Sequence, residues 1–225
     1  MINVFINKAK RTDIPKDAVI LTKGEALRMQ WDIISNWKSK TDTWPFTIGL
    51  GVLASVNAAT SLNVVLYFRN KLKLQNYGRI SMAMPTVVIP SVLTAVSHQY
   101  LVTNEILLGE SCPLCVQTRA AALQVAIGAV IPLLSTPVAA FFYADAYNTY
   151  NVPKPGLKNI PQFFSLWLVL LRKMKSKLPI IIGINAITAA TLTYYEADSF
   201  YKMQSIIYEN EERFRRNLEE SRSQI

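Results

Sequence analysis

The chain has 225 residues, of which 51% are hydrophobic and 17% are charged, and its formal net charge is +9. Soluble domains carry roughly 25% charged residues, so this composition argues against a soluble globular protein. The basic residues lie between long apolar runs, where orientation in a membrane and contact with anionic lipid account for them. No nucleic-acid recognition motif accompanies them. We therefore predict a membrane protein and no nucleic-acid partner.

The N-terminal segment, residues 1–43, is basic and contains one amphipathic helix. Thr22 and Glu25 fit a capping box, in which each side chain bonds to the backbone N–H of the other residue. Apolar side chains then recur on one helical face, at Leu27, Trp31, Ile34 and Trp37. This pattern favours either a helix in the lipid headgroup region or one packed on the rest of the protein.

Four long runs without charged residues follow, and they predict a membrane domain over residues 44–195. The runs are residues 44–68, 80–102, 120–142 and 178–195. About 20 apolar residues cross a bilayer as a helix, whereas barrel strands alternate over about ten residues. The predicted fold class is therefore an all-α integral membrane protein. It has four transmembrane helices and amphipathic N-terminal, interfacial and C-terminal helices.

Polar residues and prolines inside these runs indicate how the helices pack. Asn57 needs a hydrogen-bond partner within the bundle, and we interpret it as a contact between helices. His98, the only histidine, is predicted to lie at the membrane interface. Prolines occur in pairs, at positions 85 and 90 and at positions 132 and 137. We interpret them as kinks that shape packing. Broken helices in matching positions can mark a transport site, so a small solute carrier is a functional candidate. It ranks third, because the first three runs hold no charged residue.

The only two cysteines form a Cys112-Pro-Leu-Cys115 turn before the third run, with Arg119 four residues later. A helix N-terminus can activate a thiol. The turn therefore resembles that of the quinone-coupled disulfide-forming enzymes of bacterial membranes. Those enzymes need a second cysteine pair, and their turn opens the second span. The other interpretations of the two cysteines are a structural disulfide, half of a metal site, or two thiols without a function. We favour a structural role and expect no catalytic residue, cofactor or metal.

Two amphipathic segments flank the fourth run. Residues 162–177 are predicted to form an interfacial helix that ends in a basic cluster able to hold an anionic phospholipid headgroup such as cardiolipin. The cluster comprises Arg172, Lys173, Lys175 and Lys177. Residues 196–225 are predicted to form a charged C-terminal helix with a narrow apolar seam that touches a partner or the N-terminal helix. The seam comprises Phe200, Met203, Ile207, Phe214 and Leu218.

The charges of the loops predict an orientation. The first and third loops are rich in Lys and Arg, whereas the middle loop, with the cysteines, carries Glu105, Glu110 and Arg119. Positive loops stay on the cytoplasmic or matrix side. The cysteine loop and both termini are therefore expected on the opposite side of the membrane.

Several short motifs, in this order and spacing, resemble the transmembrane protein 126 family of the mitochondrial inner membrane over roughly residues 50–180. They are Asn57-Ala-Ala59, Phe68-Arg69, Pro85, Ile89-Pro90, Cys112-x-x-Cys115-x-x-x-Arg119, Ile127-Gly128, Pro132, Pro137 and Arg172-Lys-Met174. The resemblance implies a non-enzymatic factor that binds membrane-arm subunits or assembly intermediates of respiratory complex I, together with other assembly factors. In that membrane, the orientation expected from the loop charges would place the cysteine loop and both termini in the intermembrane space. A quinone-coupled thiol–disulfide oxidoreductase is the alternative.

Overall fold

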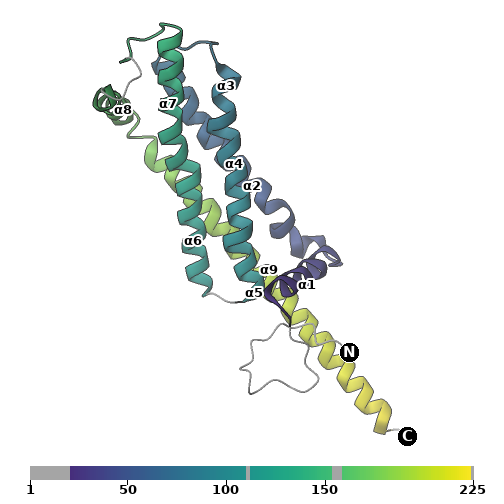
Figure 1. The fold of residues 1–225 in the computed structure, drawn as a ribbon. Helices are drawn as coiled ribbons and strands as arrows, with labels where there is room; N and C mark the ends of the chain where they lie inside the picture. Colours follow the sequence, from purple (N-terminus) through teal and green to yellow (C-terminus); the bar gives the residue numbers. More distant parts are fainter. Residues whose placement is uncertain (1–20, 110–111, 154–158, 224–225) are drawn as a thin grey trace.

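The structure is a computed structural model that describes residues 21–109, 112–153 and 159–223, and each regular element in these ranges is a helix (Figure 1). This confirms the predicted all-α class. The α-helices are α1 Lys23–Ser35, α2 Lys40–Lys71, α3 Arg79–Ala83, α4 Ile89–His98, α5 Asn104–Leu108, α6 Pro113–Val125, α7 Ile131–Ala146, α8 Ile160–Lys173 and α9 Leu178–Ser223. The π-helical turns are η1 Met84–Val88, η2 Gln99–Thr103 and η3 Ala126–Val130.

Helix α1 begins at the predicted capping box. The Thr22 hydroxyl accepts a bond from the Glu25 backbone N–H at 3.4 Å, and the Glu25 carboxylate accepts one from the Thr22 backbone N–H at 2.8 Å. The Thr22 backbone N–H and then its hydroxyl hold the pKa of Glu25 below its ordinary value. Ile34 is buried, and Trp31 meets Phe46 of α2 edge-on. Of the two alternatives for this helix, the structure shows the one packed on the bundle.

Four long helices are apolar enough to cross a membrane: Lys40–Lys71, Arg79–Leu108, Pro113–Ala146 and Leu178–Ser221. Each contains one of the four predicted runs. The second consists of α3, η1, α4, η2 and α5 in succession, and the third consists of α6, η3 and α7. Pro85 lies in η1, and Pro90 and Pro132 each follow a π-helical turn by two residues, whereas Pro137 lies inside α7; the two long helices stay continuous. The boundary predicted between residues 195 and 196 is not a break, because α9 runs through it.

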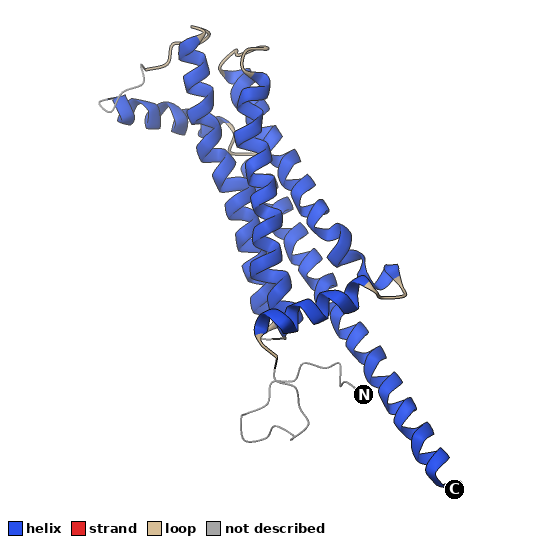
Figure 2. Cartoon of the chain, turned by 45° about the vertical axis from the view of Figure 1, so that its right-hand side comes forward, coloured by secondary structure: helices blue, strands red, loops and turns tan. Residues whose placement is uncertain are grey.

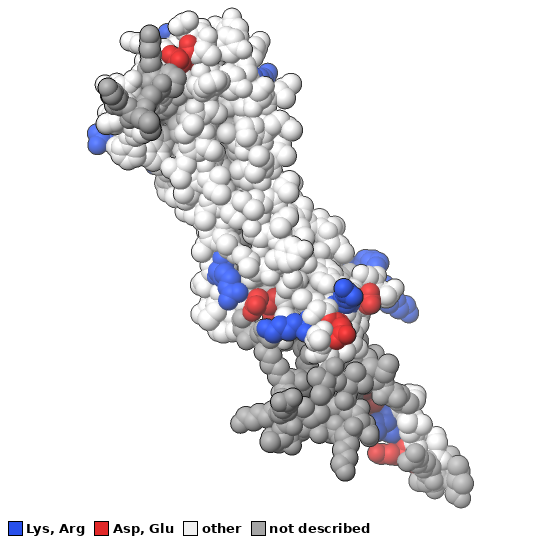
Figure 3. All heavy atoms as spheres, viewed as in Figure 1, with Lys and Arg blue, Asp and Glu red and all other residues white. Residues whose placement is uncertain are grey.

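The long helices form an antiparallel bundle with two distinct ends (Figures 1 and 2). The cysteine end, as we call it, holds α1, α5 and the start of α6, and the C-terminal part of α9 extends beyond it. The opposite end holds α3, the end of α7, and α8; we call it the α8 end. Figure 3 shows charged side chains at both ends of the visible face and an uncharged band between them. This distribution is typical of a multi-pass membrane protein.

Helix α8 lies across the axis of the bundle, as an interfacial helix does (Figure 2). The Trp167 indole N–H donates to the Leu133 carbonyl at 3.1 Å, and the Tyr67 hydroxyl donates to the Leu170 carbonyl at 2.9 Å. Pro137 has no N–H to offer the Leu133 carbonyl four residues earlier, so the indole satisfies a group that the proline leaves unpaired. The helix is shorter than the predicted 162–177, because Met174–Lys177 form the turn into α9.

The bundle has two apolar cores with a polar layer between them. The core near the α8 end includes Val64, Phe68, Leu72, Met82, Phe141 and Met174. The core near the cysteine end includes Ile34, Phe46, Leu53, Leu107, Val116 and Leu192. The polar layer is made of Asn57, Thr60, Ser61, Thr94, Gln124 and Asn185, all buried. On each of the helices the layer falls between positions that belong to the two cores.

Candidate functional site

One half of the polar layer centres on Asn57 of α2. Its amide nitrogen donates to the Thr94 hydroxyl and, at 2.9 Å, to the Pro90 carbonyl, both in α4. The Asn57 amide oxygen accepts from the Ser61 hydroxyl at 2.9 Å. All three side-chain hydrogen bonds stay within the protein, as a bilayer interior requires. The prediction that Asn57 connects two helices is confirmed.

The other half of the layer centres on Asn185 of α9. Its amide nitrogen donates to the Thr60 hydroxyl at 3.2 Å, and its amide oxygen accepts from the Gln124 amide at 3.2 Å. Gln124 also donates to the Leu53 carbonyl at 3.3 Å. Gly128 makes room for this contact, since a Cβ atom on it would lie 2.4 Å from the Asn185 amide oxygen. These bonds join α2, α6 and α9, so the buried amides are already occupied as contacts between helices.

A second polar cluster, near the cysteine end, joins His98 of α4, Thr103 of η2 and Glu196 of α9. The His98 Nε2 atom lies 3.3 Å from both carboxylate oxygens of Glu196. The Thr103 hydroxyl donates to the same oxygens at 3.3 and 3.4 Å. His98 is 3% exposed and Glu196 is 0% exposed. The prediction of an interfacial His98 is therefore wrong: the side chain lies inside the bundle because a buried carboxylate on α9 provides its partner.

Sequence reasoning missed Glu196, which it assigned to the solvated C-terminal helix. A signal was present, because Glu196 falls at helical spacing among apolar positions of α9. Ala189, Leu192, Phe200 and Met203 are all buried. A charged residue in phase with such a row lies on the buried face of its helix. The partner could not be identified in the same way, since His98 is 98 residues away in the sequence.

The cysteine turn lies at the start of α6. Cys112 is the N-cap residue and has extended backbone angles, φ −57° and ψ 130°, and Pro113 occupies the first helical position. Cys112 and Cys115 are both exposed free thiols. The backbone N–H of Cys115, the Cys115 thiol and the backbone N–H of Leu114 hold the pKa of the Cys112 thiol below its ordinary value. The predicted association of the pair with a helix N-terminus is confirmed, and the turn opens the third long helix.

Arg119 lies one turn further along α6 and bonds to the neighbouring long helix. Its guanidinium donates to the Leu101 carbonyl in η2 at 3.2 Å. Backbone carbonyls in a π-helical turn are imperfectly paired within the helix, so an arginine from a neighbouring helix is a suitable partner. Arg119 therefore connects the second and third long helices near the cysteine end.

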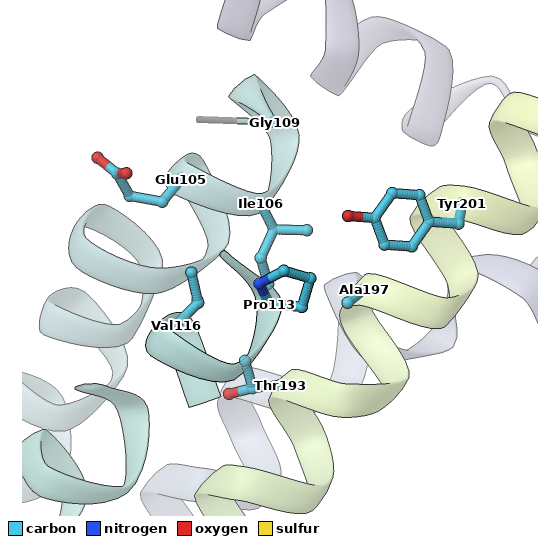
Figure 4. Close-up of a pocket in the computed structure, with 8 residues that line it drawn as sticks. All are labelled: Glu105, Ile106, Gly109, Pro113, Val116, Thr193, Ala197 and Tyr201. Carbon is cyan, nitrogen blue, oxygen red and sulfur yellow. The ribbon is translucent and has the colours of Figure 1, made fainter. Parts of the chain in front are cut away.

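A narrow crevice lies beside the cysteine turn, between α5, α6 and α9 (Figure 4). Pro113 and Val116 form one wall, Ile106 another, and Ala197 and Tyr201 a third. Its enclosed volume of about 10 Å³ is close to the space of one water molecule. A crevice of this size does not hold a substrate, and neither cysteine lines it.

The basic cluster predicted to contact lipid lies at the α8 end. Arg172 and Lys173 complete the last turn of α8, and Lys175 and Lys177 lie in the turn before α9. All four side chains are exposed, whereas Met174 between them is buried. The buried methionine fixes the backbone, so the four cations project from a rigid turn at the foot of an interfacial helix.

The structure divides the predicted seam of α9 into two parts. Phe200 and Met203 are each 3% exposed and belong to the core at the cysteine end together with Ile34 of α1, so of the two contacts predicted for the seam these residues make the one within the chain. They pack inside because the bundle and α1 surround this part of α9. Ile207 is half-buried at the edge of the bundle. Phe214 and Leu218 are 46% and 45% exposed, on the part of α9 that extends beyond the bundle (Figures 1 and 2).

Comparison with known proteins agrees with this architecture. The sequence profile described as "Transmembrane protein 126" matches residues 30–210. A protein named "Transmembrane protein 126" from Drosophila melanogaster is 33% identical over 200 residues, which cover 88% of this chain and 89% of that protein. No solved structure matches the chain. With four apolar helices and a match that spans most of its length, the chain belongs to the transmembrane protein 126 family.

Proposed function

We propose that this protein is a non-enzymatic assembly factor of the mitochondrial inner membrane, which binds and stabilises the membrane arm of respiratory complex I during its assembly. Its partners are membrane-arm subunits or assembly intermediates and other assembly factors. The part of α9 beyond the bundle carries the proposal. It exposes Phe214 and Leu218 on a helix that nothing in the described chain covers. An apolar seam on an otherwise charged helix is a suitable contact for a partner helix.

The use of the buried polar side chains supports a scaffold. Asn57, Gln124 and Asn185 bond to other helices, and Glu196 pairs with His98. Groups bound in this way hold the four helices in one arrangement, which presents α9 to a partner at a defined position.

The test uses cells in which the gene is deleted and then replaced. We expect deletion to lower assembled complex I and to leave a membrane-arm intermediate. The wild-type chain should restore assembly and migrate with that intermediate on native gels. The Phe214→Asp, Leu218→Asp variant should insert normally, yet neither migrate with the intermediate nor restore complex I. Burial of each side chain contributes roughly 1.5–3 kcal/mol, so the loss of both weakens binding by well over tenfold.

Arg216→Glu is the matched control. It lies on the opposite face of α9 and changes the net charge by the same −2, so it should restore assembly fully. Normal complex I in the deletion cells would refute the proposed function. Normal rescue by the Phe214→Asp, Leu218→Asp variant would show instead that the exposed seam is not the interface.

A further inference from the structure

The cysteine turn has the parts of a dithiol site, and its geometry distinguishes the two thiols. Cys112 is the N-cap residue immediately before α6, and its thiol is exposed. Cys115 lies inside that turn, where its carbonyl accepts a bond from the Thr118 hydroxyl at 3.0 Å. The helix N-terminus favours a thiolate, because unpaired N–H groups and the helix dipole both stabilise negative charge there. Cys112 is therefore the better nucleophile, and its lowered pKa agrees.

The spacing allows the two sulfurs to bond to each other. Side chains three residues apart on a helix have Cβ atoms about 5–6 Å apart, and a disulfide needs a Cβ separation of roughly 4 Å. Cys112 has non-helical backbone angles, although its carbonyl accepts from the Val116 N–H at 3.1 Å, so its side chain can close this gap while α6 stays intact. Pro113 fixes the backbone between them, since its ring already holds φ at the helical value.

We propose that Cys112 and Cys115 form a thiol–disulfide exchange site, in which Cys112 attacks an external disulfide and Cys115 resolves the mixed disulfide. In the first step the Cys112 thiolate bonds to one sulfur of the external disulfide. The bond between the two external sulfurs breaks, and the first thiol leaves with a proton from solvent. In the second step Cys115 gives its proton to solvent and attacks the Cys112 sulfur, which releases the second thiol. Two protein thiols are oxidised and one external disulfide is reduced.

The surroundings of the turn suit this exchange. Arg119 is engaged by the Leu101 carbonyl, so activation of the thiol comes from the start of α6. The crevice of Figure 4 continues from Pro113 along Val116 and ends at Tyr201 of α9. The exchange needs no quinone and no second cysteine pair, so it differs from the oxidoreductase alternative. It also goes beyond the assembly function, which does not use the thiols.

The test treats the purified full-length protein with oxidised glutathione and follows each thiol by mass spectrometry. The Cys115→Ser variant should accumulate one glutathione on Cys112, because no resolving thiol is present. The wild-type protein should instead form the internal disulfide and release both glutathione molecules. The Cys112→Ser variant should react measurably more slowly than Cys115→Ser, since Cys112 is the thiol at the helix N-terminus, where a thiolate is favoured.

Equal rates for the two single variants, or a wild-type protein that retains glutathione and forms no internal disulfide, would overturn the proposal. Both positions are exposed, so serine variants should keep the unfolding temperature of the wild-type protein. The double variant Cys112→Ser, Cys115→Ser should also restore complex I assembly in deletion cells. A failed exchange reaction would therefore leave the assembly function untouched, and the reverse also holds.

Discussion

Gly128 of η3 packs against the side chains of Asn57 in α2 and Asn185 in α9, so a single added methyl group there tests the polar layer. A Cβ atom would lie 2.4 Å from the Asn185 amide oxygen and 3.3 Å from the Asn57 side chain. We expect Gly128→Ala to lower the free energy of unfolding by about 1–3 kcal/mol, because it displaces both amides. Unfolding in mixed detergent micelles measures this difference.

Gly51 supplies the control for that substitution. Nothing lies within 4 Å of the position its Cβ would take. Gly51→Ala should therefore be neutral or slightly stabilising, since alanine favours a helix by up to about 1 kcal/mol. If both variants lose the same stability, the effect of Gly128→Ala is not due to the polar layer.

The His98–Glu196 pair allows a second test at the residue scale. Removing one partner leaves the other buried without its counterpart, so His98→Ala and Glu196→Ala should each cost about 3–5 kcal/mol. The double variant should cost clearly less than the sum, with a coupling of about 1 kcal/mol or more. The exposed pair of Arg213 and Glu209, 3.8 Å apart, is the control and should show almost no coupling. Additive losses at His98 and Glu196 would mean that the two side chains do not stabilise each other.

At this scale the sequence shows which side chains require a hydrogen-bond partner inside the bundle, but not which residue provides it. A lone amide in an apolar run must bond inside the bundle, so the role of Asn57 could be predicted. The contact between His98 and Glu196 could not, because it depends on how two distant helices align along their lengths. The phase of Glu196 on α9 was nevertheless readable from the apolar residues around it.

At the scale of elements, α8 and the turn after it give a prediction about lipid. We expect the exposed cations Arg172, Lys173, Lys175 and Lys177 to hold an anionic headgroup such as that of cardiolipin. Replacing all four by Gln should reduce the cardiolipin that stays bound in native mass spectrometry, and added salt should reduce wild-type binding in parallel. Replacing Arg213, Arg215 and Arg216 of α9 by Gln should leave bound cardiolipin unchanged. Equal loss in both variants would argue against a specific site at the α8 end.

The helices themselves followed from the sequence because run length and absence of charge dominate in a membrane. Their ends did not, because charged residues such as Lys40 and Lys71 continue a helix into the aqueous phase without changing its backbone. The sequence left open which contact the buried part of the α9 seam makes, for a related reason. Periodicity shows which face of a helix is apolar, but whether Phe200 meets its own bundle or a partner depends on tertiary packing.

At the scale of the whole molecule, the bundle predicts which parts of the chain share one side of the membrane. The cysteine turn and the C-terminal part of α9 lie at one end, and the turn after α8 lies at the other (Figure 1). In a background without native cysteines, we expect the thiol of Ser205→Cys to react with an impermeant reagent from the intermembrane-space side. The thiol of Ser176→Cys should react only after the membrane is opened.

Both serines are exposed, so the comparison depends on the side of the membrane rather than on burial. The native Cys112 and Cys115 should follow the pattern of Ser205→Cys. Labelling of Ser176→Cys and Ser205→Cys from the same side would contradict the arrangement. The reverse pattern would keep the bundle but invert its orientation, against the charges of the loops.

Because α9 is continuous, it fixes the distance between the bundle and the exposed seam. A helix rises about 1.5 Å per residue, so Phe214 stands roughly 27 Å along the axis from Glu196, which is anchored in the bundle. A partner bound to the seam would therefore lie at a fixed distance from the bilayer and in a fixed direction (azimuth) around the α9 axis. Lengthening α9 by seven residues would keep the azimuth but raise the partner by about 10 Å, whereas two extra residues would turn it to the far side.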